Sequence, residues 1–157
     1  MKRLLLLTFV LFSIAATAQR NPFKNLTEKN GKIGIGTKAP DELLTVKGVI
    51  HTQEVKVDLN GAVAPDYVFE KYFTGSSRYM PEYHLISLEE LEAFISQHHH
   101  LPKLPSASEM EEDGMSLKEM NLLLLEKIEE LTLYTIQQQK EIDALKEKVL
   151  EREGPDE

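Results

Sequence analysis

Hydrophobic and polar positions divide the chain into stretches with different periods. Three short pieces, KIGIGT, ELLTVKGVI and TQEVKVD, alternate apolar with polar residues, and a period of two predicts β-strands. In SLEELEAFISQHHH and again in residues 116–153 the apolar residues recur every three or four positions, which predicts helices. The pattern therefore predicts an α+β protein with a short β-stem (residues 32–59), a small α/β unit (60–115) and a C-terminal helix (116–153).

The predicted strands are too short to form a stable sheet by themselves. A lone hairpin is marginal in water, and unpaired strand edges promote aggregation unless they are covered. We therefore expect the stem to pair with, or pack against, the same segment in neighbouring copies, with Ile33 and Ile35 at the interface. The polar residues 19–31 are predicted to form a flexible lead-in, and residues 154–157 a disordered tail.

The small α/β unit contains most of the aromatic residues and two helix starts. PDYVFEKYF is expected to begin as a strand or extended arm that packs on the helix after it. Ser87 followed by Glu90 has the spacing of a capping box, and Ser106 with Glu109 repeats it, so two helices are expected. A unit of this size without disulfides is marginally stable, so a further stabilising element is expected.

The C-terminal helix carries a heptad repeat. Ser116 and Glu119 have capping-box spacing, and no Gly or Pro interrupts the pattern before residue 153. Additional apolar residues between Leu122 and Ile136 predict that the first half of the helix also packs on the preceding unit. Positions a and d of the repeat, predicted to form the interface between chains, are Leu117, Asn121, Leu124, Ile128, Leu131, Thr135, Gln138, Ile142, Leu145 and Val149.

This repeat predicts a parallel coiled coil between copies of the chain. A helix of about 54 Å would otherwise leave its terminal apolar residues in water. Glu141 at position g would face Lys146 at position e of a neighbouring chain, an exposed pair of opposite charge. Two alternatives stay open: antiparallel packing of the helix on its own domain, and two chains rather than three, because the heptad rules alone do not decide the number.

The first 18 residues have the features of a secretory signal peptide. Lys2 and Arg3 precede an apolar run that ends in Ala16-Thr17-Ala18, and the run is too short for a membrane span. We expect an exported protein, periplasmic, at the cell surface or extracellular, with no membrane span after cleavage. It has no cysteine and carries 26 acidic against 18 basic residues, which argues for stabilisation by assembly and against nucleic acid as a partner.

Two motifs resemble a known family. The segments GKIGIGTKAPDELLTVKGVI and HLPKLPSASEMEEDGMSLKEMNLLLLEKIEELTLY are similar to bacterial secreted proteins with a tail-fibre-like C-terminal domain. Those proteins are distantly related to the S74 intramolecular chaperone domain of phage tail spikes and fibres. The resemblance implies an intertwined trimeric β-stem and a trimeric bundle of terminal helices.

The same resemblance raises self-cleavage, which S74 domains perform after trimerisation. The family uses a serine followed by Asp, with a lysine soon after; here Pro65 precedes Asp66, and Lys71 follows. No hydroxyl is present at that position to attack a carbonyl. Ser76 and Ser77 lie in a Gly-containing loop and are interpreted as turn residues. We therefore expect no catalysis and a permanent trimer.

His98, His99 and His100 are the weak candidates for a metal site. Three consecutive imidazoles cannot all point one way on a helix, and they are typical of a helix C-terminus. The carboxylates of EKIEE are interpreted as a solvated face, and no cofactor is expected.

The sequence thus predicts an exported, non-catalytic structural or assembly protein that forms a homotrimeric stem and clamp. An adhesive surface for an unknown ligand is expected on the stem or between Tyr67 and Tyr83. The alternatives are a self-cleaving S74-type chaperone and a metal-binding exported protein.

Overall fold

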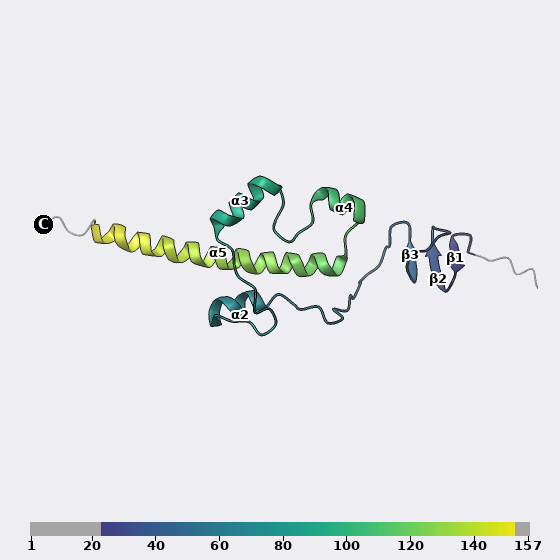
Figure 1. The fold of residues 1–157 in the computed structure, drawn as a ribbon, viewed down its shortest axis with the longest axis horizontal. Coiled ribbons are helices and arrows are strands. Elements are labelled where there is room, and N and C mark those ends of the chain that lie inside the picture. Colours follow the sequence, from purple (N-terminus) through teal and green to yellow (C-terminus); the bar gives the residue numbers. More distant parts are fainter. Residues whose placement is uncertain (1–22, 153–157) are drawn as a thin grey trace, which may run out of the picture. The chain divides into compact units, whose positions relative to one another are not determined.

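The computed structural model describes residues 23–152, which form two units that divide after residue 55. This part of the chain is α+β, with a three-stranded sheet in the first unit and four helices in the second (Figure 1). The predicted signal peptide, residues 19–22 of the lead-in and the predicted tail lie outside the described residues.

The first unit is built around β1 (Leu26–Lys29), β2 (Lys32–Ile35) and β3 (Leu44–Val46). β1 and β2 form an antiparallel hairpin, and β3 joins the other edge of β2 in parallel, which gives the order β1-β2-β3. The turn of the hairpin is Asn30-Gly31, both with positive φ, as a two-residue hairpin turn requires. The prediction of a flexible lead-in over residues 19–31 is therefore wrong for β1, and Asn-Gly was the signal for it.

The observed strands also differ from those predicted for the stem. β2 coincides with KIGI, but β3 covers only part of ELLTVKGVI, and TQEVKVD has no strand. Both edges of β2 are paired within the chain, with Ile33 opposite Glu28 on one side and opposite Leu44 on the other. The expectation that β2 needs other copies for its backbone hydrogen bonds is therefore wrong, because β1 supplies the missing partner.

Gly36 ends β2 where no other residue fits. Its φ is +74°, and a Cβ atom there would lie 2.7 Å from the carbonyl oxygen of Lys47. Its amide donates to the Asn25 carbonyl at 2.9 Å, and the amide of Lys47 donates to the Ile35 carbonyl at 2.9 Å. The last glycine of the IGIG motif thus lets the three strands converge.

The second unit contains α2 (Tyr67–Thr74), α3 (Leu88–His98), α4 (Ala107–Asp113) and α5 (Leu117–Arg152). The strand or arm predicted for PDYVFEKYF is wrong, because the segment from Tyr67 is helix α2. The helix ends at Gly75, which has φ 81°, and the Gly75 amide donates to the Lys71 carbonyl. Packing of Tyr67 and Val68 into the core outweighs the strand preference of the aromatic residues.

The two capping boxes of the α/β unit are confirmed. The Ser87 side chain accepts from the Glu90 amide, and the Ser106 side chain accepts from the Glu109 amide. In each box the glutamate side chain in turn accepts from the backbone amide of the capping serine. α3 ends at His98 because His99 adopts the left-handed conformation, with φ 59°. At the start of α5 the Glu119 amide donates to Ser116 Oγ at 3.4 Å.

A small core forms where α2 meets the first half of α5. It contains Tyr67, Val68, Tyr83 and Leu133, and the rings of Tyr67 and Tyr83 meet edge to face at 5.2 Å. α2 lies on one side of α5, and α3 and α4 lie on the other (Figure 1). The prediction that the first half of α5 packs on the preceding unit is confirmed.

Candidate functional site

The a and d positions of α5 form an exposed apolar stripe, which we call the seam. Its seven apolar residues are between 44% (Leu124) and 63% (Leu131) exposed. The polar seam residues Asn121 and Thr135 hydrogen-bond to carbonyls of their own helix, those of Leu117 and Leu131. The complete seam consists of Leu117, Asn121, Leu124, Ile128, Leu131, Thr135, Gln138, Ile142, Leu145 and Val149.

The opposite side of α5 is acidic and buried. Glu126, Glu129 and Glu130, which we call the carboxylate face, are each at most 8% exposed. The interpretation of EKIEE as a solvated face is therefore wrong. The sequence signal for the correct result was the set of tyrosines and lysines elsewhere in the unit, which supply the donors that buried carboxylates need.

Glu126 receives hydrogen bonds from two segments of the unit. The Tyr67 hydroxyl of α2 donates to Glu126 Oε2, and Lys103 Nζ, from the loop after α3, lies 2.5 Å from Oε1. Burial raises the pKa of Glu126, but the hydrogen bonds from Lys103 and Tyr67 and the nearby lysine charges together hold it below its ordinary value. Glu126 is therefore a carboxylate that ties α2 and the loop to α5.

Glu130 is held in the same way one turn later. The Tyr83 hydroxyl donates to Glu130 Oε1 at 3.1 Å, and Lys127 Nζ lies 2.7 Å from Oε2. The Tyr134 hydroxyl donates to the Ile86 carbonyl at 2.7 Å, which fixes the segment that leads into α3. Burial is the main cause of the raised pKa of both Tyr83 and Tyr134, so both remain protonated donors.

Glu129 differs from its two neighbours because no lysine or arginine of residues 23–152 pairs with it. Its Oε2 atom is buried and makes no hydrogen bond within the described part of the chain. Burial, and then the charges of Asp66 and Glu126, raise the pKa of Glu129. The carboxylate face thus contains two satisfied carboxylates and one that is destabilising when charged.

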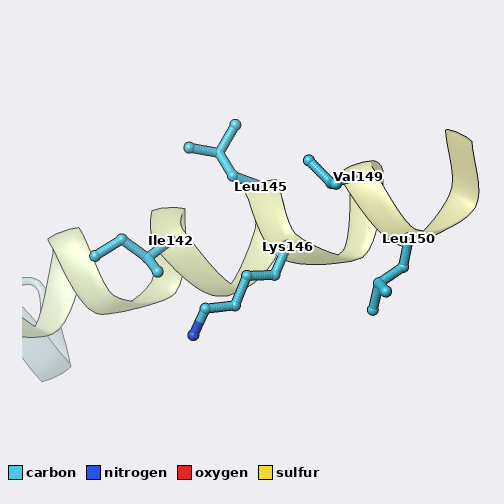
Figure 2. A pocket seen from close by; sticks show the side chains of 5 residues that line it. All are labelled: Ile142, Leu145, Lys146, Val149 and Leu150. Atoms are coloured by element: carbon cyan, nitrogen blue, oxygen red, sulfur yellow. The ribbon is translucent and has the colours of Figure 1, made fainter. Parts of the chain in front are cut away.

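Beyond Gln138, α5 runs past the other elements of the second unit. α3 and α4 have no Cα atom within 8 Å of α5, and in Figure 1 the last part of α5 extends beyond α2, α3 and α4. Leu145 and Val149 point to one side of the helix, while Lys146 and Leu150 point to the other (Figure 2). The alternative in which the helix packs back on its own domain through the seam does not occur here, since Ile142, Leu145 and Val149 are all exposed.

The remaining sequence candidates lie apart from the seam. Ile33 and Ile35, in the first unit, are 42% and 40% exposed although their backbone is paired. The His98 ring stacks on Phe94 with the ring centroids 4.3 Å apart, and His100 Nδ1 lies 3.0 Å from the Leu101 carbonyl oxygen. Within residues 23–152, no three His, Cys, Asp or Glu side chains come together in a way that fits a metal ion.

The segment that resembles a self-cleavage site is engaged in structural contacts. Pro65 is fully buried, and Lys71 Nζ donates to the Pro81 carbonyl at 3.0 Å. Ser77 Oγ donates to Glu70 at 2.7 Å and accepts from the amides of Tyr79 and Met80. Ser77 therefore acts as the turn residue that the sequence predicted.

Comparison of the chain with protein-family models, with curated proteins and with solved structures finds no match. None of the helices between residues 23 and 152 has an apolar stretch long enough to cross a membrane. The resemblance to S74 domains therefore stays a prediction from the two motifs.

Proposed function

We propose that this chain is an exported, non-catalytic structural protein whose copies assemble into a parallel homotrimer through the α5 seam. The observation that carries the proposal is the reversed amphipathicity of α5. The helix buries three glutamates, together with Leu133 and Tyr134, against its own domain and leaves the seven apolar side chains of the seam exposed. A helix in a monomer would have the opposite arrangement, because burying charge costs free energy and burying leucine releases it.

The free energy available from covering the seam is large. Covering the exposed part of each apolar seam residue contributes on the order of 1 kcal/mol at the usual value per area. The carboxylate face is already occupied by α2 and by Tyr83, so it orients the seam away from the domain. The carboxylate face of α5 then packs against the rest of its own unit, and the seam binds other copies of the chain.

Charge and the family resemblance support the details of the arrangement. Glu141 and Lys146 lie at g and e positions, where opposite charges face one another in a parallel, in-register bundle. The number three comes from the resemblance to trimeric fibre domains. Ile33 and Ile35 remain candidate contacts between stems through their side chains, which are exposed.

The proposal is tested with a pair of substitutions on one turn of α5. Leu145→Glu places a charge in the seam, whereas Ala144→Glu places the same charge on an exposed position outside it. We expect sedimentation velocity to give smaller species for Leu145→Glu and unchanged species for Ala144→Glu. If both variants sediment like the parent protein, the seam does not join the copies.

A further inference from the structure

Asparagine followed by glycine occurs twice in the chain, and both pairs form turns of the same shape. Asn30 and Gly31 have φ angles of 54° and 77°. Asn60 and Gly61 have φ angles of 49° and 83°. The first turn closes the β1–β2 hairpin, whereas the second, which we call the linker turn, lies in the long coil between β3 and α2 (Figure 1). The chain thus places one kind of turn in two different surroundings.

An Asn-Gly pair can lose ammonia without an enzyme. The amide nitrogen of the glycine attacks the side-chain carbon Cγ of the asparagine, so that an N–Cγ bond forms, the Cγ–Nδ2 bond breaks and ammonia leaves with the amide proton. Water then opens the resulting succinimide ring and gives aspartate or isoaspartate, and nothing is oxidised or reduced. Glycine favours this attack because it has no Cβ atom to restrict the backbone.

The hairpin turn holds its glycine amide away from this reaction. The Gly31 amide donates to Glu28 Oε1 at 2.9 Å, so its proton is bound to a carboxylate and its nitrogen is directed away from the asparagine side chain. Lys29 pairs with Lys32 across the two strands, which keeps the backbone in the turn conformation. Both restraints have to break before Asn30 can react.

The linker turn lacks these restraints. Asn60 and Gly61 are both exposed, and within the described part of the chain the Gly61 amide makes no hydrogen bond. One backbone hydrogen bond closes the turn, from the Ala62 amide to the Leu59 carbonyl at 3.0 Å. Between residues 48 and 61 no backbone amide donates to a backbone carbonyl, so no paired strands continue from the turn. The backbone here can therefore rearrange at little cost, as closure of the succinimide ring requires.

We propose that Asn60 is a site of spontaneous deamidation and that Glu28 and the hairpin protect Asn30 from the same reaction. The product carries one additional negative charge per chain, two residues after Asp58. Its isoaspartate form also has one more main-chain atom in the segment that joins β3 to α2. The inference is independent of the proposed assembly, because the linker turn lies outside the seam.

Mass spectrometry after cleavage behind glutamate tests the proposal, because each Asn-Gly pair then lies in a fragment of its own. Residues 29–42 contain Asn30, residues 55–70 contain Asn60, and neither fragment contains another asparagine or a glutamine. The folded full chain is incubated near neutral pH and sampled over time before cleavage. We expect Asn60 to react roughly tenfold faster than Asn30, because a hydrogen bond to a carboxylate must break before Gly31 attacks.

Two controls separate the effect of the fold from that of the sequence. In urea both sites should react at similar rates, because both turns are lost and both pairs are Asn-Gly. In Glu28→Ala the reaction at Asn30 should accelerate, while Asn60 in the same molecule keeps its rate. This substitution removes one cleavage position, so tandem mass spectrometry of the longer fragment scores Asn30 separately.

The outcomes are distinct. Faster reaction at Asn60 than at Asn30 in the folded protein, with similar rates in urea, supports the assignment. Equal rates in the folded protein, or reaction at neither site while both react in urea, would overturn Asn60 as the modification site. An unchanged rate at Asn30 in Glu28→Ala would overturn the protective role of Glu28.

Discussion

Glu126 and Ile128 lie two residues apart on α5 and have opposite environments. Glu126 is 3% exposed and accepts hydrogen bonds from Tyr67 and Lys103, whereas Ile128 is 59% exposed on the seam. A two-residue step on a helix turns the side chain by roughly 200°. The domain therefore covers the carboxylate side of α5 and leaves the apolar side for other copies, which leads to the following expectations.

Tyr67→Phe should destabilise the second unit. It removes the hydroxyl that donates to Glu126 while keeping the ring that packs on Tyr83. Losing a hydrogen bond to a charged group costs about 1.5–3 kcal/mol. Urea unfolding at fixed protein concentration measures the change, and Tyr79→Phe, at an exposed tyrosine, should alter the free energy of unfolding little. Equal effects of the two substitutions would show that the Glu126 bond is unimportant.

Glu129→Gln should stabilise the protein at pH 7. Its carboxyl has a raised pKa because of burial and the charges of Asp66 and Glu126, so the charged form is unfavourable in the folded state. Removing the charge should add on the order of 1 kcal/mol, comparable with relieving one unsatisfied buried group. Thermal melting of Glu129→Gln beside Glu147→Gln, an exposed control on the same helix, checks this.

The pH dependence of that gain has a definite sign. A carboxyl whose folded pKa is raised destabilises the folded state above its ordinary pKa of 4.5, and the penalty disappears as the pH falls. The advantage of Glu129→Gln should therefore shrink as the pH falls toward 4.5. A gain that grows on acidification would contradict the assignment.

Lys103→Met should weaken the protein at neutral pH and not in acid. The pKa of Glu126 is lowered, so Glu126 stabilises the fold above its ordinary value of 4.5, and this contribution is lost as the pH falls through the folded pKa. Because Lys103 is half exposed, removing it should cost about 1 kcal/mol at neutral pH. The difference from the parent, measured by urea unfolding, should vanish in acid; a constant difference would point to lost packing instead.

Gly36→Ala should disrupt the three-stranded sheet. Its left-handed φ costs a residue with a Cβ atom roughly 1–2 kcal/mol, and the new methyl group would clash with the Lys47 carbonyl. Gly48→Ala is the control, because a Cβ atom at Gly48 meets nothing within 4 Å. Hydrogen exchange of the β2 amides should accelerate in Gly36→Ala and remain unchanged in the control.

Local signals predicted α3, α4 and α5 well and the environment of their side chains less well. The starts of α3 and α4 could be predicted because a capping box involves only four consecutive residues, here Ser87 to Glu90 and Ser106 to Glu109. The heptad repeat likewise gave the exposed seam of α5 and nearly its whole length. Both depend on neighbours along the chain, so both can be derived from the sequence.

The missed features depend on contacts between distant residues. Burial of Glu126 needs Tyr67, which lies 59 residues earlier, and burial of Glu130 needs Tyr83, 47 residues earlier. α2 was expected as a strand because its aromatic residues favour sheets, whereas packing on α5 selects the helix. β1 was missed because its residues are mostly polar and its pairing with β2 is recognisable only from Asn30-Gly31.

The measurement that tests the central proposal most directly is the mass of the native mature protein by light scattering behind size exclusion, with intact-chain mass spectrometry on the same fractions. We expect three uncut chains, as the exposed seam and the absence of a serine at Pro65 predict. A full-length monomer would contradict assembly through the seam, and a trimer of shortened chains would contradict the non-catalytic assignment.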